Sequence, residues 1–163
     1  NSKLKKNKFK IHLVISNKQA ARGLNYAKLN KIKSFAIEKK LKEFENKSLF
    51  LIKKYKINYI CLAGFMRILS SSFIKKAKIP IINIHPSLLP KFKGLNTHKR
   101  AIKSKKKFSG CTVHYVSEKL DSGKIILQKK VKILKKDNSK TLASKVLKLE
   151  HKAYSEALNL IIN

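Results

Sequence analysis

Acidic residues are scarce in this chain, and their scarcity sets its charge. Only 8 Asp and Glu residues stand against 40 Lys and Arg residues among 163, which gives a net charge of +32 at pH 7. Such a charge suggests a basic nucleic-acid-binding module. Arginine, however, whose planar guanidinium reads bases and phosphates, occurs only as Arg22, Arg67 and Arg100. The longest stretches without lysine are 57–74 and 79–90. A solvated lysine-rich surface explains this spread better, and the nucleic-acid module stays an alternative.

Long apolar runs and clustered cysteines are also missing. No apolar run approaches the ~18 residues that a membrane-spanning helix needs, and no export signal follows the basic start, so we expect a cytoplasmic protein without a membrane partner. Cys61 and Cys111 stand alone in strand-like segments, so we expect neither a disulfide nor a metal site. Glycine-rich phosphate loops and the Gly-x-Ser-x-Gly motif do not occur either, which leaves dinucleotide, phosphate-loop and hydrolase functions without support.

The apolar pattern predicts alternating strands and helices. Amphipathic spacing indicates helices through Tyr26, from Leu41 to Tyr55, over 70–78 and from Asn138 to the end, and β-branched runs indicate strands at 11–16, 59–64, 80–85, 110–116 and 125–133. This order implies right-handed βαβ units. We therefore expect an α/β fold, a doubly wound, mostly parallel sheet with flanking helices, in one domain over residues 1–163. Its ligand site should lie at the carboxyl ends of the strands.

Two polar side chains end the third predicted strand. Asn83 and His85 are two residues apart, so both point to one face at the end where ligands bind. An amide and an imidazole there can stabilise the anion that forms when a nucleophile adds to a carbonyl group. A charged histidine needs a nearby carboxylate, and Asp121 in a later loop is the candidate. The alternatives are a structural histidine and an ordinary turn aspartate, and we interpret His114 and Thr112 as supporting residues.

The segment that follows the buried strand at 59–64 carries a lone cation. Arg67 stands there among apolar residues. Such an arginine either lines a pocket for a flat, partly apolar, anionic ligand or packs its stem against the loop. The residues alone leave both interpretations open.

Several motifs occur in an order typical of one enzyme family. They are residues 62–69, 83–90, 94–98, 110–116 and 120–123, with Glu150-His151 in the last predicted helix. These motifs closely resemble the phosphoribosylglycinamide formyltransferases of purine biosynthesis, over essentially the whole chain. The resemblance implies a folate-dependent transferase that moves the formyl group of 10-formyltetrahydrofolate to the amine of glycinamide ribonucleotide. It would use no metal, bind no specific nucleic acid, and act as a monomer or homodimer.

The resemblance also implies roles for individual residues. Asn83 and His85 would stabilise a tetrahedral oxyanion, with His85 also a proton donor, and Asp121 would keep His85 protonated and help to move the proton. Glu150 matches a residue that contacts the ribonucleotide. Folate would contact Asn83 and two segments, formed by Met66, Arg67, Ile68 and Leu69 and by Ser117, Glu118, Lys119, Leu120 and Asp121.

One part of the family pattern is missing. Family members begin with a strand and a Gly-x-Gly-Ser/Thr-Asn loop that holds the substrate phosphate, and this chain starts after both, so we expect a domain truncated at its N-terminus.

Formyltetrahydrofolate deformylase has a similar Asn, His and Asp arrangement and stays an alternative function. Methionyl-tRNA formyltransferase also needs a second, C-terminal domain, for which no residues are left.

Overall fold

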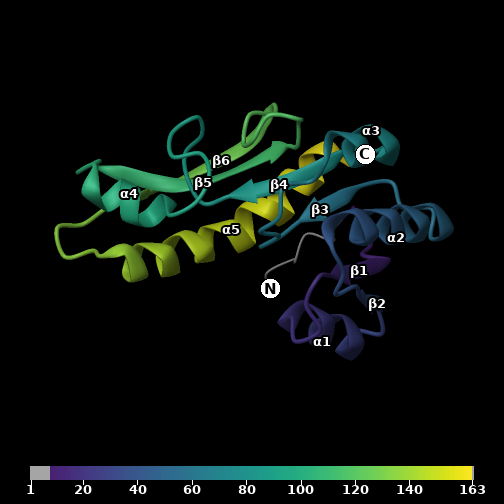
Figure 1. The fold of residues 1–163 in the computed structure, drawn as a ribbon. Helices are drawn as coiled ribbons and strands as arrows, with labels where there is room; N and C mark the ends of the chain where they lie inside the picture. Colours follow the sequence, from purple (N-terminus) through teal and green to yellow (C-terminus); the bar gives the residue numbers. More distant parts are fainter. Residues whose placement is uncertain (1–7, 163) are drawn as a thin grey trace. The chain divides into compact units, whose positions relative to one another are not determined.

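Strands and helices alternate along most of the chain, as the apolar pattern predicts (Figure 1). The computed structural model describes residues 8–162. In chain order the elements are β1 (Leu13–Ser16), α1 (Arg22–Leu29), β2 (Lys33–Ala36), α2 (Leu41–Lys54), β3 (Ile60–Leu62), α3 (Ser71–Ala77), β4 (Ile81–His85), α4 (Thr97–Lys103), β5 (Phe108–Tyr115), β6 (Ile125–Lys132) and α5 (Ser139–Ile161). Only β2 and α4 have no counterpart among the predicted elements.

The described residues divide into two units. Residues 10–60 and 65–80 form the smaller unit, and residues 8–9, 61–64 and 81–162 form the larger unit. The predicted single domain over 1–163 stays a prediction.

The smaller unit is built on a parallel strand pair. β1 runs alongside β2, with Leu13 opposite Lys33 and Ser16 opposite Ala36, and α1 provides the crossover that parallel strands need. A core of apolar side chains gathers on one face of α2 and around the strands, made of Ile37, Phe44 and Leu51 with Leu13, Ile15, Phe35, Tyr55 and Phe65 packed against them. The helical spacing of the apolar residues in α2 therefore fixes which of its faces is buried.

The larger unit contains a sheet in the order β3-β4-β5-β6. β5 pairs antiparallel with both β4 and β6. The loop from β5 to β6 has only nine residues, 116–124, which suits a hairpin but not the crossover that parallel strands require. The predicted α/β class, with parallel pairing and flanking helices, is confirmed, and the structure adds antiparallel pairing toward β6.

The helix α5 covers β5 and β6 (Figure 1). It begins at a capping box, in which the Asn138 side chain accepts from the Lys140 and Thr141 N–H groups and Thr141 Oγ1 accepts from the Asn138 N–H. Its buried side chains are Leu142, Val146, Ala153, Ala157 and Leu158. Further along, the Tyr154 hydroxyl lies 2.8 Å from the Leu62 carbonyl oxygen and 3.0 Å from that of Ile82, so it ties α5 to β3 and β4.

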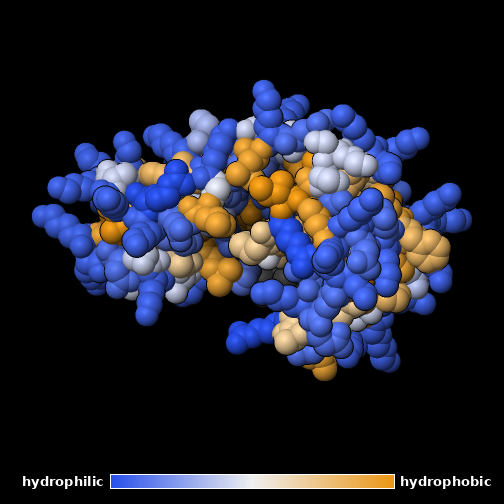
Figure 2. Space-filling model, viewed as in Figure 1, coloured by the Kyte–Doolittle hydropathy of each residue, from blue (hydrophilic) through white to orange (hydrophobic). Residues whose placement is uncertain are grey.

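The surface is largely hydrophilic. Hydrophilic side chains cover most of the face seen in Figure 2, with apolar groups between them. Among the described helices, none combines the length and the apolar content that crossing a bilayer demands.

Candidate active site

The end of β4 presents Asn83 and His85 beside β5. In the sheet Asn83 lies opposite His114, and His85 lies opposite Thr112. Residues 81 and 82, at the start of the same strand, are apolar and buried, so the strand is anchored before its polar end. The strand periodicity therefore places both polar side chains on one face at the carboxyl end of β4, as the sequence predicts.

Asp121 reaches this position from the loop between β5 and β6. Its φ of 45° lies in the left-handed region, which aspartate tolerates better than most residues. Gly123 closes the same turn, where an added Cβ would overlap the Tyr115 carbonyl. Asp121 is thus a turn residue and a member of the site at once, because the tight turn aims its carboxylate at the end of β4.

Four side chains form a largely buried group, the Asp121 cluster, made of Asn83, His85, His114 and Asp121. Asp121 Oδ2 lies 3.4 Å from His85 Nδ1, and Asp121 Oδ1 lies 3.9 Å from His114 Nε2. The side chains of both histidines and the aspartate are at most 8% exposed. The structure therefore brings together the three residues proposed for catalysis and adds His114 to them.

Backbone groups fix the orientation of the His85 ring and the Asp121 carboxylate. His85 Nε2 lies 2.9 Å from the Phe92 carbonyl oxygen, and the Gly94 N–H donates to Asp121 Oδ2 at 2.8 Å. A carbonyl oxygen only accepts, so Nε2 must carry a hydrogen. Nδ1 is then the nitrogen that faces the carboxylate and can take up a second proton.

His114 holds the amide of Asn83. Its Nδ1 lies 2.9 Å from the Tyr115 carbonyl oxygen and so carries the hydrogen, which leaves Nε2 to accept from Asn83 Nδ2 at 3.4 Å. Burial lowers the pKa of His114 and the charge of His85 acts in the same direction, whereas the Tyr115 carbonyl and Asp121 raise it. A neutral His114 therefore uses one hydrogen of the Asn83 amide and leaves the other for a ligand.

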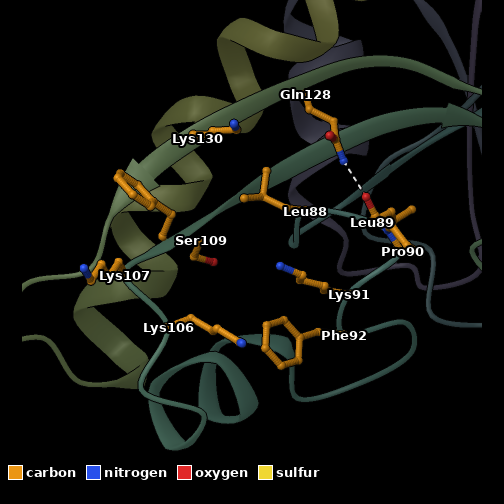
Figure 3. Close-up of a pocket in the computed structure, with 11 residues that line it drawn as sticks. Leu88, Leu89, Pro90, Lys91, Phe92, Lys106, Lys107, Ser109, Gln128 and Lys130 are labelled. Carbon is orange, nitrogen blue, oxygen red and sulfur yellow. Dashed lines mark hydrogen bonds between the residues drawn. The ribbon is translucent and has the colours of Figure 1, made fainter.

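Thr112 supports the loop that follows β4. Its hydroxyl donates to the Ser87 carbonyl at 2.6 Å and accepts from the Leu89 N–H and from Gln128 Nε2. Gln128 Nε2 also lies 2.9 Å from the Leu89 carbonyl oxygen (Figure 3). These contacts explain why a fully buried threonine stands in the middle of β5.

Two segments correspond to the implied folate contacts. Residues 117–121 lie in the β5–β6 loop and include Asp121, and their Leu120 is 51% exposed. Residues 66–69 belong to the smaller unit, where Met66 and Ile68 are 76% and 66% exposed. Both segments thus offer apolar side chains that a flat ligand could cover.

Arg67 is bound within its own unit. Its guanidinium donates to the Lys39 carbonyl at 2.8 Å and lies 6.0 Å from the centre of the Phe44 ring. Of the two interpretations of this arginine, the contacts support the packed one directly. A ligand that also uses Arg67 would have to share the guanidinium with Lys39.

Glu150 lies half-buried on α5. Burial raises its pKa above the ordinary value for a glutamate. Its charge also contributes to the raised pKa of Cys111 in β5, about 11, of which burial is the larger cause. A carboxylate kept partly out of water in this way is suited to a ligand that supplies hydrogen-bond donors.

The structure adds residues that the strand pattern did not reveal. Phe92, Gly94 and His98 all act near His85, and all lie in or beside the quoted motif 94–98. Within the described residues, His98 Nδ1 is buried without a hydrogen-bond partner, and burial together with the charge of His85 lowers the pKa of His98. The motif supplied a signal for Gly94 and His98, but Phe92 acts through its carbonyl group, which leaves no mark in a sequence.

A cavity of about 340 Å³ opens next to Phe92 in the larger unit (Figure 3). Its lining combines apolar residues with lysines, namely Leu88, Leu89, Pro90, Lys91, Phe92, Lys106, Lys107, Phe108, Ser109, Gln128 and Lys130.

In residues 8–162 no group of three His, Cys, Asp or Glu side chains is placed as metal ligands would be. The Asp121 cluster itself offers hydrogen-bond donors and a proton acceptor, a combination suited to addition to a carbonyl group.

Comparison with known proteins identifies the family. The formyl transferase family model matches residues 1–158. The phosphoribosylglycinamide formyltransferase of Bacillus subtilis is 36% identical over 156 residues, which cover 92% of this chain and 79% of that enzyme. The crystal structure of phosphoribosylglycinamide formyltransferase from Anaplasma phagocytophilum superposes with a TM-score of 0.89 at 42% identity, and the match covers 95% of this chain and 76% of that one.

Multifunctional proteins also contain a matching region. The human trifunctional purine biosynthetic protein adenosine-3 is 43% identical over 155 residues. The match covers 93% of this chain but only 15% of the human protein. The family model, the bacterial enzymes and the superposed structure agree with one another. The chain belongs to the formyl transferase family and, within it, to the phosphoribosylglycinamide formyltransferases.

Proposed function

We propose that the chain transfers a formyl group from 10-formyltetrahydrofolate to the amine of 5-phosphoribosylglycinamide, in de novo purine biosynthesis. The observation that carries the proposal is the Asp121 cluster, in which Asn83, His85 and Asp121 converge from two elements of the larger unit. Such a group suits the addition of an amine to a formyl carbon. The named activity of the bacterial relatives supports the same reaction. A cytoplasmic location and a monomeric or homodimeric state remain predictions.

The first step creates an anion that the site must stabilise. The glycine amine of the ribonucleotide attacks the formyl carbon, a C–N bond forms, and the electron pair of the C=O bond moves to oxygen. Asn83 Nδ2 would donate its second hydrogen to this oxyanion, since His114 uses only the first. The Nδ1 side of His85 would donate to the same oxygen while the ring is protonated.

The second step moves one proton from nitrogen to nitrogen. The attacking amine loses a proton, the bond from the formyl carbon to N10 of the folate breaks, and N10 gains a proton. His85 and Asp121, 3.4 Å apart, would carry this proton, with water as a relay. The C=O bond re-forms, and the products are the formylated ribonucleotide and tetrahydrofolate.

The substrates would contact members of this cluster and the segments around it. We assign the folate to Met66, Arg67, Ile68 and Leu69, to the loop Ser117, Glu118, Lys119, Leu120 and Asp121, and to Asn83. Glu150 would accept hydrogen bonds from the ribonucleotide, because its carboxylate is half-buried and has raised proton affinity in the unliganded chain. No metal is assigned to the reaction.

Tetrahydrofolate release, followed by absorbance with and without the ribonucleotide, tests the proposal. The chain should be compared with an extended chain that carries, at its N-terminus, a strand and glycine-rich loop of the kind that the family resemblance implies. Release that requires the ribonucleotide supports the transferase. Release without it would indicate a deformylase, and no release from either chain, with salt-sensitive retention on DNA, would favour a nucleic-acid-binding module.

A further inference from the structure

A single loop supplies the backbone groups that orient the Asp121 cluster. In this anchor loop, residues 92–96, the Phe92 carbonyl accepts from His85 Nε2, and the Gly94 N–H donates to Asp121 Oδ2. Both contacts are made by main-chain atoms. The orientation of the His85 ring and of the Asp121 carboxylate therefore depends on how the anchor loop is folded, and not on which side chains it carries at these two positions.

The anchor loop has a backbone conformation that few residues adopt readily. Phe92, Gly94 and Asn96 have φ values of 57°, 75° and 56°. Glycine adopts the left-handed region freely and asparagine tolerates it, but for phenylalanine it is unfavourable. A loop of this kind keeps its shape only where neighbouring groups hold it.

Arg100, in α4, supplies this support. Its Nη1 donates to the Lys93 carbonyl at 2.6 Å and lies 3.4 Å from the Leu95 carbonyl oxygen. The guanidinium carbon also lies 5.5 Å from the centre of the Phe92 ring. One planar group thus binds the carbonyl groups on both sides of Gly94 and stacks over the residue whose own carbonyl holds His85.

The choice of arginine at this position is unusual for the chain. Of 40 Lys and Arg residues, only three are arginine. A lysine ammonium is a single point of charge and cannot present a planar face to a ring while its donors reach two carbonyl groups. Position 100 therefore has a guanidinium where its geometry, and not only its charge, is used.

We infer that Arg100 is a positioning residue for the proposed formyl transfer, acting through the anchor loop on His85 and Asp121. It keeps the Phe92 carbonyl hydrogen-bonded to Nε2 of His85, so that Nδ1 continues to face the carboxylate of Asp121. When the loop is released, Nε2 loses the carbonyl acceptor that keeps the hydrogen on it, and the two neutral tautomers of the ring can interconvert. The inference rests on the proposed function for its kinetic consequence, but not for the orientation of the ring.

The other charged or titratable groups around His85 leave this role to the anchor loop. Asp121 faces Nδ1 from the β5–β6 loop, while His98 on α4 and His114 on β5 lie close enough for the charge of His85 to lower their pKa values. His114 has its own partners in Tyr115 and Asn83. Among the described contacts, the Phe92 carbonyl is the acceptor for Nε2.

Nitrogen-15 NMR of the imidazole side chains tests the inference in Arg100→Ala and Arg100→Lys, with Lys99→Ala as the matched control on the same helix. The His85 signals are identified by their loss in His85→Ala. In the parent chain and in Lys99→Ala, Nε2 should show the shift of a nitrogen that carries hydrogen. In both Arg100 variants the two ring nitrogens should move toward averaged shifts, because neither variant can hold the loop.

Kinetics on the extended chain supply the second measurement. Both Arg100 variants should lower kcat about 10-fold or more with KM for each substrate changed less than about 2-fold, since misplacement acts on the reacting groups and not on substrate binding. Guanidinium ion should restore part of the kcat of Arg100→Ala but not of Arg100→Lys, where the side chain still fills the site.

Unchanged His85 shifts in Arg100→Lys would overturn the inference, whether or not any variant transfers formyl groups. Unchanged kcat in folded Arg100→Ala would also overturn it. If Arg100→Ala does not fold, the Arg100→Lys spectrum alone decides. Failure of the proposed function is a separate result, because it would show as absent turnover in the parent chain while the NMR comparison still reports on the ring.

Discussion

The Asp121 cluster and the segment 66–69 differ in how complete they are without a ligand. In the cluster, His85 and His114 are 6% and 2% exposed, and the ring nitrogens of both have partners. In the segment, Met66 and Ile68 are 76% and 66% exposed. The first region is oriented in advance by the protein, whereas the second leaves apolar side chains exposed.

This difference indicates a division of labour between reaction and recognition. Hydrogen-bond donors that the fold already holds in place need little reorientation during the reaction, so the cluster is suited to stabilising a transition state. Exposed apolar side chains gain most when a ligand buries them, so the segment is suited to ground-state binding. Substitutions in the cluster should therefore lower kcat, and substitutions in the segment should raise KM.

His85→Ala is expected to give the largest effect. The change removes both the charged donor to the oxyanion and the proton carrier, so kcat should fall by about 10²- to 10⁴-fold. KM should change little, and thermal unfolding should stay cooperative. The variant is measured by tetrahydrofolate release on the extended chain, with circular dichroism for the fold. A near-normal rate in a folded variant would mean that His85 is a structural strand-end histidine.

Asp121→Asn tests the charge of the Asp121 side chain separately from its role in the turn. The amide oxygen can still accept from the Gly94 N–H, and asparagine also tolerates the φ of 45° at this position, so the loop should keep its shape. Only the charge that faces His85 is lost, and kcat should fall by about 10²-fold. The measurement is the rate at saturating substrates. If the variant retains its rate, Asp121 serves the turn alone.

Much of the site could be predicted from the sequence because it follows local rules. The two-residue strand period places Asn83 and His85 on one face, and Asp121-Ser122-Gly123 is a turn signal. Both rules concern side-chain types at fixed spacing. The family motifs then indicated how these separate pieces combine.

The missed features are those without a side-chain signal. β2 has four residues, one of them Lys33, and α4 has seven, too few for a clear helical period. The Phe92 carbonyl and the Gly94 N–H act through the main chain. Their role depends on positive φ values and on Arg100, and neither can be read from composition or periodicity.

Ile68→Ala should affect substrate binding more than turnover. If the folate covers about half of the removed apolar surface, affinity falls by about 1 kcal/mol, or about 5-fold. KM for 10-formyltetrahydrofolate should rise by this factor with kcat nearly constant. Phe50→Ala is the matched control, because Phe50 is also exposed in the same unit, at 65%, and is not assigned to the folate. A fall in kcat without a change in KM would remove the distinction between the two regions.

Glu150→Gln should give the smallest effect, which is a change in stability. It tests whether burial of the Glu150 carboxylate destabilises the folded chain when no ligand is bound. Burial raises the pKa of Glu150 in the folded chain, so the folded carboxyl group binds its proton more tightly than the unfolded one. Stability from this group is therefore present below the unfolded pKa and is lost as the pH rises through the higher folded pKa. At neutral pH the variant should melt slightly higher than the parent chain, and near pH 4 the two should melt together. KM for the ribonucleotide should rise at the same time. Equal destabilisation at both pH values would show instead that Glu150 makes a stabilising contact, which would leave its assignment to the ribonucleotide without support.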